Sequence, residues 1–422
     1  TCAPDLTALG HVAEGPLGRT CRPPRTPNLR IIARSPSLLP VTYPRPDLPE
    51  GKLLASLSDH EAEHYVSETL EWVETIHAHE RFDLLIVNHL ALQCEVAQRL
   101  RQRHLVPFRV VVHGTGLLYG VSESETVNAR VAKSVTDADQ IVTLNPPLLE
   151  RVLSSFPSVE PLCVVVPPGT DTETFQDCAE QRDHEITFVG RICFDKGVHA
   201  LLTAFPLVRQ RHPTVRLALV GAGPHEDALK AAWRALAKGD RRGFIEECNR
   251  AARRDGVAES TLEPTARFLE SVTDEYFEHA QRAADAVEWV GPLGRQAVAE
   301  RLAHGAAAVL PSIVPEAHPL SVCEALATGT PVVGTGKAGI AQILGELERA
   351  APELRGRLLA DANPELFVRS LAERISDLLS RPPSDRAKSL SREIVQTNFA
   401  WANTARALTT GVAAATWEVQ NA

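Results

Sequence analysis

Two glutamates, Glu316 and Glu324, follow a short apolar run, Ala307–Leu310, in a pattern suited to binding hydroxyl groups. The run predicts a buried strand, and a helix is expected to begin near Ser321, whose type is favoured as an N-terminal cap. A loop at the carboxyl edge of a sheet, beside a helix N-terminus, suits an anionic ligand. Ionised carboxylates only accept hydrogen bonds, so the two acids could hold the hydroxyls of a sugar and of a ribose. A solvated loop acid and an unrelated helix acid are the alternative.

Two cations, Arg191 and Lys196, follow another apolar run that ends at Gly190. They lie in a turn that opens a predicted helix. The guanidinium group offers a planar fork of donors and the ammonium group a point charge, a combination expected for a diphosphate. For this spacing alone, two exposed surface cations are the alternative.

A histidine, His113, ends a third apolar run and is followed by Gly114 and Gly116. A side chain at the carboxyl end of a buried strand lies where α/β domains bind their ligands. A structural role for a single histidine at such a position remains the alternative.

Two series of Val- and Ile-rich runs alternate with amphipathic segments and must position these side chains. The runs of the first series are 29–33, 83–87, 109–113, Gln140–Thr143 and 162–166, and those of the second are 186–190, 215–220, 287–290, Ala307–Leu310 and 331–334. Continuous rather than alternating hydrophobicity marks strands buried on both faces of a parallel sheet. We therefore predict an α/β protein with two doubly wound, Rossmann-like domains.

A turn rich in Pro, Gly and Asp at 167–183 separates the two series and predicts a domain boundary near residue 178. Within the second series, about fifty residues around 230–284 are rich in Ala, Arg, Glu and Asp and indicate a helical insertion. The insertion is either solvated decoration or a contact for an acceptor or a second subunit.

Composition excludes several classes of protein. The chain has 422 residues, 44% of them apolar, enough for two globular domains. The balance of 44 basic and 53 acidic residues gives 44 − 53 = −9, which argues against a nucleic-acid partner. No apolar run approaches a membrane span, and no signal peptide is recognised, so we expect no transmembrane segment. Eight scattered cysteines without a C-x-x-C pair fit a cytoplasmic protein without a metal site.

Taken together, the segments from about Phe82 to Trp401 resemble a retaining glycosyltransferase of the GT-B fold, of the kind grouped as glycosyltransferase family 4. Five motifs in the family's order carry the resemblance: the His-Gly pair at 113–114, the linker at 168–175, Gly-Arg-x4-Lys-Gly at 190–197, the segment 219–224, and the E-x7-E pair with its tail to 333. Residues 399–401 resemble the start of the family's closing helix. The resemblance implies two domains facing each other across a deep crevice. Residues 1–178 would form the acceptor-side domain, completed by a helix over 399–422, and residues 179–398 the donor domain.

The resemblance also assigns roles to the matching positions. Arg191 and Lys196 would hold the donor diphosphate and neutralise the leaving group. Glu324 would bind the ribose, Glu316 the donor sugar near its anomeric carbon, and His113 the sugar from the opposite domain. His113, Glu316, Arg191 and Lys196 are thus the candidate catalytic residues. The candidate donor-binding residues are Gly190, Arg191, Lys196, Glu316, Leu320, Ser321 and Glu324, and the candidate acceptor-side residues are Asn88 and His89.

The implied reaction moves a hexose from a nucleotide diphosphate sugar, by expectation a UDP-sugar, to an acceptor hydroxyl. The family retains anomeric configuration by front-face attack and usually needs no metal, so we expect no cofactor besides the nucleotide sugar. The chain departs from the family pattern at Pro319, where Gly is common, and at Gln342, where Glu is usual.

Four other functions compete with this interpretation. A sugar phosphorylase or an epimerase could share the fold. A non-catalytic sugar-binding protein would be expected to have lost its charged donor-site residues, yet all four are in place. An NAD-dependent oxidoreductase is disfavoured, because the segment from Gly221 to His225 begins like a dinucleotide loop but has no third glycine and contains Pro224.

Overall fold

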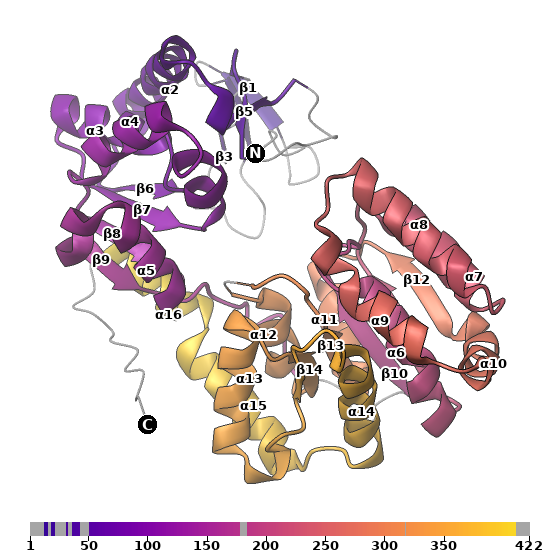
Figure 1. Cartoon of the computed structure of the whole chain (residues 1–422). Coiled ribbons are helices and arrows are strands. Elements are labelled where there is room, and N and C mark those ends of the chain that lie inside the picture. The colour runs from indigo at the N-terminus through magenta and orange to yellow at the C-terminus, as the bar shows by residue number, and fades with distance from the viewer. Residues whose placement is uncertain are drawn as a thin grey trace. The chain divides into compact units, whose positions relative to one another are not determined.

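The computed structural model describes residues 12–15, 18–21, 31–32, 36–42, 50–177, 184–316 and 318–410, and the chain divides into two compact units (Figure 1). Unit 1 comprises residues 1–166 and 406–422, and unit 2 comprises residues 167–405. The boundary predicted near residue 178 falls in 178–183, outside the described residues. Helix α16 (Trp401–Thr410) contains the point where the chain returns to unit 1. The helix predicted over 399–422 therefore begins at Trp401 rather than at Phe399, and its part after Thr410 lies outside the described residues.

A four-stranded parallel sheet forms the centre of unit 1. Its strands follow chain order: β6 (Leu85–Asn88), β7 (Phe108–Val112), β8 (Gln140–Thr143) and β9 (Cys163–Val165). The main connecting helices are α3 (Gln93–His104), α4 (Glu125–Val135) and α5 (Pro146–Ser155), and α2 (Asp59–Glu80) packs against α3. All four residues of β8 are buried, as expected for a strand covered on both faces.

The first predicted strand, at 29–33, does not join this parallel sheet. Its described part is β3 (Ile31–Ile32), which pairs antiparallel with β2 (Gly18–Cys21), itself paired with β1 (Val12–Gly15). The remaining short elements of unit 1 are β4 (Pro40–Val41), β5 (Lys52–Leu53), η1 (Leu54–Ser56), η2 (Leu117–Val121) and η3 (Pro157–Leu162).

Unit 2 is built on a six-stranded parallel sheet with the order β12-β11-β10-β13-β14-β15. The strands are β10 (Glu185–Val189), β11 (Arg216–Val220), β12 (Val287–Gly291), β13 (Ala307–Leu310), β14 (Val332–Thr335) and β15 (Leu359–Ala360). The chain builds outward from β10 in one direction and then returns to add β13 on its other side. This order is that of a doubly wound sheet, whose ligand crevice lies at the point of reversal, between β10 and β13.

Helices cover both faces of this sheet. The helices are α6 (Val198–Arg211), α11 (Arg295–His304), α12 (Leu320–Ala327), α13 (Ala338–Ala350), α14 (Phe367–Ser380) and α15 (Asp385–Asn398), with the short η6 (Pro352–Leu354). Helices α6 and α14 pack together, and α11 packs on α12. Within the described ranges, no helix is long and apolar enough to cross a membrane.

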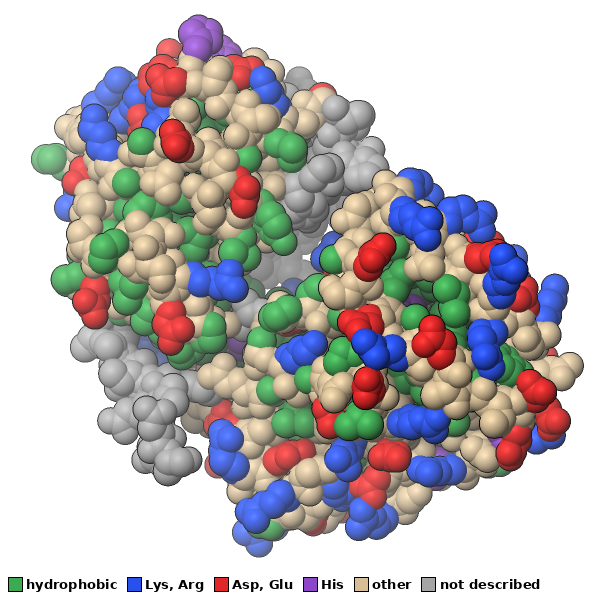
Figure 2. Space-filling view, in the orientation of Figure 1, with side chains coloured by type: hydrophobic (Ala, Val, Ile, Leu, Met, Phe, Trp, Pro, Cys, Tyr) green, Lys and Arg blue, Asp and Glu red, His purple; other side chains and the backbone are tan. Residues whose placement is uncertain are grey.

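The predicted insertion is helical and follows β11. It consists of α7 (Glu226–Leu236), α8 (Arg241–Arg254), α9 (Glu263–Ser271) and α10 (Asp274–Arg282), with η4 (Glu259–Thr261) and η5 (Ala284–Ala286). Its inner faces bury large side chains such as Trp233, Phe244 and Phe268. Figure 2 shows Lys and Arg side chains gathered over α7 and α8, so the outer face of this pair is solvated and charged.

Candidate active site

Two loops meet at the reversal point of the unit 2 sheet. The first runs from the end of β10 through 190–196 to α6, and the second runs from the end of β13 through 311–319 to α12. The N–H groups of Ile313 and Val314 donate to the carbonyl oxygen of Asp195 at 2.9 and 3.4 Å, which ties the second loop to the first. The loop 190–196, which carries Arg191 and Lys196 (the cation loop), and the loop that carries Glu316 (the acid loop) are therefore brought together, as the sequence predicts.

Gly197 makes the close approach of these loops possible. Its φ of +71° lies in the left-handed region, and a Cβ atom at this position would lie 1.9 Å from the carbonyl oxygen of Pro311. No side chain fits at that distance, so glycine is required both for the turn into α6 and for the contact.

Lys196 and Glu316 form an ion pair between the two loops. Their Nζ and Oε2 atoms lie 2.6 Å apart, and their side chains are only 24% and 13% exposed. The Ser312 hydroxyl donates to the other carboxylate oxygen of Glu316, and the Gly339 N–H donates to its backbone carbonyl at 2.9 Å. Glu316 is thus held at both its side chain and its backbone, with its charge compensated.

Arg191 is the second cation of the site. It follows Gly190 in the chain and its side chain is exposed. Its guanidinium group has no hydrogen bond or ion pair to any residue that the structure describes. Gly190 itself is fixed, because its N–H donates to the carbonyl of Val220 at 3.0 Å. A rigid backbone that carries an uncompensated planar cation can receive an anionic ligand without breaking an existing ion pair.

Helix α12 begins at Leu320 behind the N-cap Pro319, one residue earlier than the start we predict at Ser321. The prediction that Ser321 caps the helix is wrong, because the carbonyl of Pro319 already accepts from the Val322 N–H at 3.0 Å. The ring of Pro319 fixes its φ near the value required before a first turn, which favours the earlier start. Ser321 therefore lies in the first turn, and Leu320 is exposed at the helix end.

Glu324 lies one turn further along α12 and is half-buried. Burial raises the pKa of its carboxyl group, while Arg295 lowers it and Asp171 raises it further. Arg295 and Asp171 pair with each other at 3.1 Å, so Arg295 is partly compensated. In the described parts of the chain, no hydrogen-bond donor reaches the carboxylate of Glu324, which leaves it available to a ligand hydroxyl.

In unit 1, the three candidate residues lie together at the ends of β6 and β7. His113 Nε2 lies 2.9 Å from Asn88 Oδ1, and the rings of His89 and His113 are 4.8 Å apart. Burial lowers the pKa of His113 to about 4 and also lowers that of His89, so both rings are neutral at physiological pH. The adjacent, parallel pairing of β6 with β7 accounts for this grouping.

Two residues next to the cation loop were not singled out by the sequence analysis. Ser312 is buried and bonds to Glu316, and its place directly after a strand and a proline is the signal that could have identified it. His225 is buried against the loop and accepts a hydrogen bond from the Phe194 N–H. Nothing in the sequence around Gly223 and Pro224 indicates the orientation of that ring.

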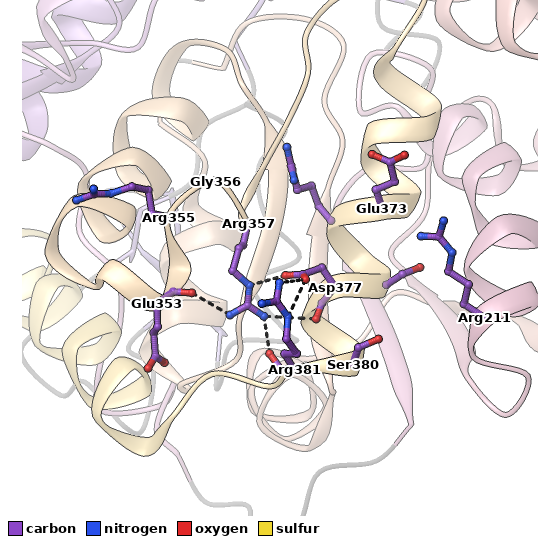
Figure 3. A pocket seen from close by; sticks show the side chains of 11 residues that line it. Arg211, Glu353, Arg355, Gly356, Arg357, Glu373, Asp377, Ser380 and Arg381 are labelled. Carbon is purple, nitrogen blue, oxygen red and sulfur yellow. Dashed lines mark hydrogen bonds and ion pairs between the residues drawn. The ribbon is translucent and has the colours of Figure 1, made fainter.

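A hollow on the opposite edge of the unit 2 sheet gathers five arginines but does not form a comparable site (Figure 3). Arg357 and Arg381 both bond to Asp377, near the end of α14, and are compensated by it. Arg211 and Arg355 lie on opposite sides of the hollow, so their guanidinium groups do not converge (Figure 3). Among the described residues, no group of three or more His, Cys, Asp or Glu side chains could hold a metal ion.

Two stretches of unit 2 match family models. Residues 170–254 and residues 267–381 each match a model described as glycosyl transferases group 1. A glycogen synthase of Mycobacterium tuberculosis is 23% identical over 344 residues, which cover 79% of this chain and 67% of that protein. A D-inositol 3-phosphate glycosyltransferase of Corynebacterium urealyticum is 26% identical over 291 residues, which cover 65% of this chain and 56% of that protein.

Solved structures share the fold. A sucrose-phosphate synthase from Thermosynechococcus elongatus superposes with a TM-score of 0.54 at 22% identity, covering 85% of this chain and 79% of that chain. The Anabaena protein HepE in complex with UDP superposes with a TM-score of 0.53 at 14% identity, covering 81% and 79%. The predicted fold class, GT-B with two Rossmann-like sheets, is confirmed. With the family models, these similarities support a GT-B glycosyltransferase.

Proposed function

We propose that the chain is a retaining glycosyltransferase of the family 4 type that transfers a hexose from a UDP-sugar to an acceptor hydroxyl. The observation that carries the proposal is the Lys196–Glu316 pair at the reversal point of the sheet, beside Arg191, which has no ion pair to a described residue. Cation and carboxylate together match a ligand that has a diphosphate at one end and sugar hydroxyls at the other. Structural neighbours are consistent with this donor: HepE was solved with UDP and glucose, and the pneumococcal transferase GtfA with UDP and GlcNAc.

Each side chain of the unit 2 site has a proposed role. Arg191 binds the diphosphate bidentately, and Lys196 adds a second positive charge. Glu316, released from part of its contact with Lys196, accepts hydrogen bonds from the donor sugar. Glu324 accepts from the ribose hydroxyls, and Gly190, Leu320 and Ser321 line the approach to it. In unit 1, His113 is assigned to the donor sugar and Asn88 and His89 to the acceptor.

The proposed chemical step replaces one bond to the anomeric carbon by another on the same face of the sugar. The bond from the anomeric carbon to the diphosphate oxygen breaks, and its electron pair leaves with the nucleoside diphosphate. The acceptor oxygen forms the new bond and gives its proton to the departing phosphate oxygen. Arg191 and Lys196 stabilise the charge that develops on the leaving group, a role that elsewhere a metal ion can fill.

We place this reaction in the cytoplasm, without metal or cofactor. The five cysteines whose side chains the structure describes are unpaired thiols, which suits a reducing compartment. The side-chain cations at the reversal point provide the positive charge that a bound Mg²⁺ would otherwise supply.

The test is turnover of a panel of UDP-, GDP- and ADP-sugars by the full chain, with release of nucleoside diphosphate and product configuration followed by NMR. Arg191→Ala should lower kcat/KM about 100-fold or more, because a strong electrostatic contact with the leaving group is lost. Arg355→Ala, an exposed arginine at the opposite edge of the sheet, is the matched control and should leave kcat/KM unchanged.

The competing functions give different results in the same assay. A phosphorylase would release sugar phosphate only when phosphate is added, and an epimerase would change the sugar without releasing nucleotide. Binding without turnover would indicate a non-catalytic protein. Loss of activity in excess EDTA that Mg²⁺ restores would contradict the metal-independent mechanism, and an unchanged Arg191→Ala variant would contradict the diphosphate assignment.

A further inference from the structure

The loop between β11 and α7 packs directly against the cation loop. Gly221, with φ of +133°, lies so close to Gly190 that a Cβ would be 2.0 Å from the Gly190 carbonyl oxygen. The Ile192 N–H donates to the Ala222 carbonyl at 3.1 Å, and the His225 N–H donates back to the Ile192 carbonyl at 3.3 Å. This segment, which begins like a dinucleotide loop in the sequence, is therefore the support of the neighbouring loop.

The side chain of His225 completes this support. Its ring stacks on that of Phe194, with centroids 4.3 Å apart and an interplanar angle of 27°. Its Nδ1 atom accepts a hydrogen bond from the Phe194 N–H at 3.2 Å. Phe194 lies between Arg191 and Lys196, so the bond fixes the backbone in the middle of the segment that carries both cations.

The tautomer of His225 follows from these contacts. Because Nδ1 accepts, the ring proton of the neutral form lies on Nε2. Nε2 lies 3.0 Å from Oδ2 of Asp255, the residue that caps the C-terminus of α8. Burial lowers the pKa of His225, which favours the neutral ring that this arrangement requires, against the opposing effect of Asp255.

The helical insertion thus contributes Asp255 to the support of the candidate site. Helices α7 and α8 pack on each other, and the end of α8 places Asp255 beside His225. The outer face of the α7–α8 pair is charged and exposed to solvent (Figure 2). At the C-terminal end of α8, the contact between Asp255 and His225 links this pair of helices to the cation loop.

We infer that His225 is a positioning residue for donor binding: oriented by Asp255, it holds the Phe194 N–H and thereby the spacing of Arg191 and Lys196. The inference rests on the proposed function, because it assumes that the cation loop binds the donor diphosphate. It predicts that His225 affects donor affinity through Nδ1, without touching the donor.

Two conservative variants separate the two ring nitrogens. In His225→Asn, the amide oxygen occupies the position of Nδ1 and can accept from Phe194, whereas in His225→Gln the amide nitrogen occupies that of Nε2 and can reach only Asp255. His212→Gln is the matched control, because half-buried His212 likewise bonds to backbone, contacting the Ser376 carbonyl at 3.1 Å, away from the loop.

Two readouts are measured on the full chain. Amide hydrogen exchange of the peptide containing Phe194, without nucleotide, reports the hydrogen bond itself. Calorimetric Kd values for UDP, GDP and ADP, with KM and kcat for the preferred donor, report its consequence. We expect His225→Gln to exchange faster at Phe194 and to raise Kd and donor KM about tenfold, the upper range for one neutral hydrogen bond, with kcat nearly unchanged. His225→Asn and His212→Gln should stay within about twofold of the wild type.

The outcomes distinguish this inference from the proposed function. If the wild type binds none of the three nucleotides, the proposed function fails, and the positioning role fails with it. If the wild type binds but His225→Gln binds equally well, only the positioning role is overturned, whatever happens to exchange at Phe194. Equal losses in the Asn and Gln variants would also overturn it, because a general packing defect would then explain both.

Discussion

Replacing Gly197 by alanine tests the contact that holds the two loops of the candidate site together. The new Cβ would lie 1.9 Å from the Pro311 carbonyl oxygen, whereas carbon–oxygen contacts are normally no shorter than about 3.3 Å. The loops must therefore separate by about 1.4 Å, the difference between these distances. The left-handed backbone adds about 1–2 kcal/mol of strain and the displaced contact about 1–3 kcal/mol.

Gly356→Ala provides the matched control. Gly356 lies in the same unit with φ of +70°, but a Cβ there would have nothing within 4 Å. It should therefore show the backbone strain alone. Urea unfolding midpoints should fall for both variants and about twice as far for Gly197→Ala. A shift of this size at a reacting site costs about 100-fold in kcat/KM, and only Gly197→Ala should show that loss. Equal midpoints together with equal turnover would refute the contact between Gly197 and Pro311.

Two further predictions concern the titration of Glu324 and the unit to which each substrate contact belongs. Glu324→Gln should raise the thermal midpoint near pH 8, because burial raises the pKa of this carboxyl group and its ionised form destabilises the folded protein there. The gain should vanish below the ordinary pKa of 4.5, where the wild-type group is protonated in both the folded and the unfolded state. Scanning fluorimetry of both proteins between about pH 4 and pH 8 checks the sign, and a gain independent of pH would contradict it. His113→Ala should lower the single-turnover rate but leave the Kd of free UDP unchanged, because His113 belongs to unit 1 and the proposed nucleotide contacts belong to unit 2. Loss of UDP binding in this calorimetric comparison would reverse the assignment.

Sequence patterns predicted the parallel sheets well where strands are buried on both faces. Gln140–Thr143 and Ala307–Leu310 have the bounds expected from their sequences, and all of their residues are buried. The described residues of the run at 29–33, Ile31 and Ile32, are just as apolar but pair in another sheet. Composition alone therefore does not determine which sheet a short run joins.

The chemical types at the site could also be predicted, but their mutual geometry could not. The adjacency of Lys196 and Glu316 follows from the placement of β13 beside β10, which is a property of the whole sheet. The start of α12 depended on a competition between a good capping serine and a proline with fixed φ, and the proline determined it. The role of His225 depends on a ring orientation that has no periodic signature in the sequence.

The strand order of unit 2 also has a consequence for how the protein folds. Strands β10 and β11 are close in the chain and can pair early, which forms the loop of Arg191 on its support at 221–225. Lys196 and Glu316 are 120 residues apart, and each doubling of a closed loop costs about 0.6 kcal/mol more in chain entropy. Glu316 can reach Lys196 only after β13, which follows the insertion and α11 in the chain, has paired with β10. Full nucleotide affinity during refolding should therefore appear only when unit 2 is complete.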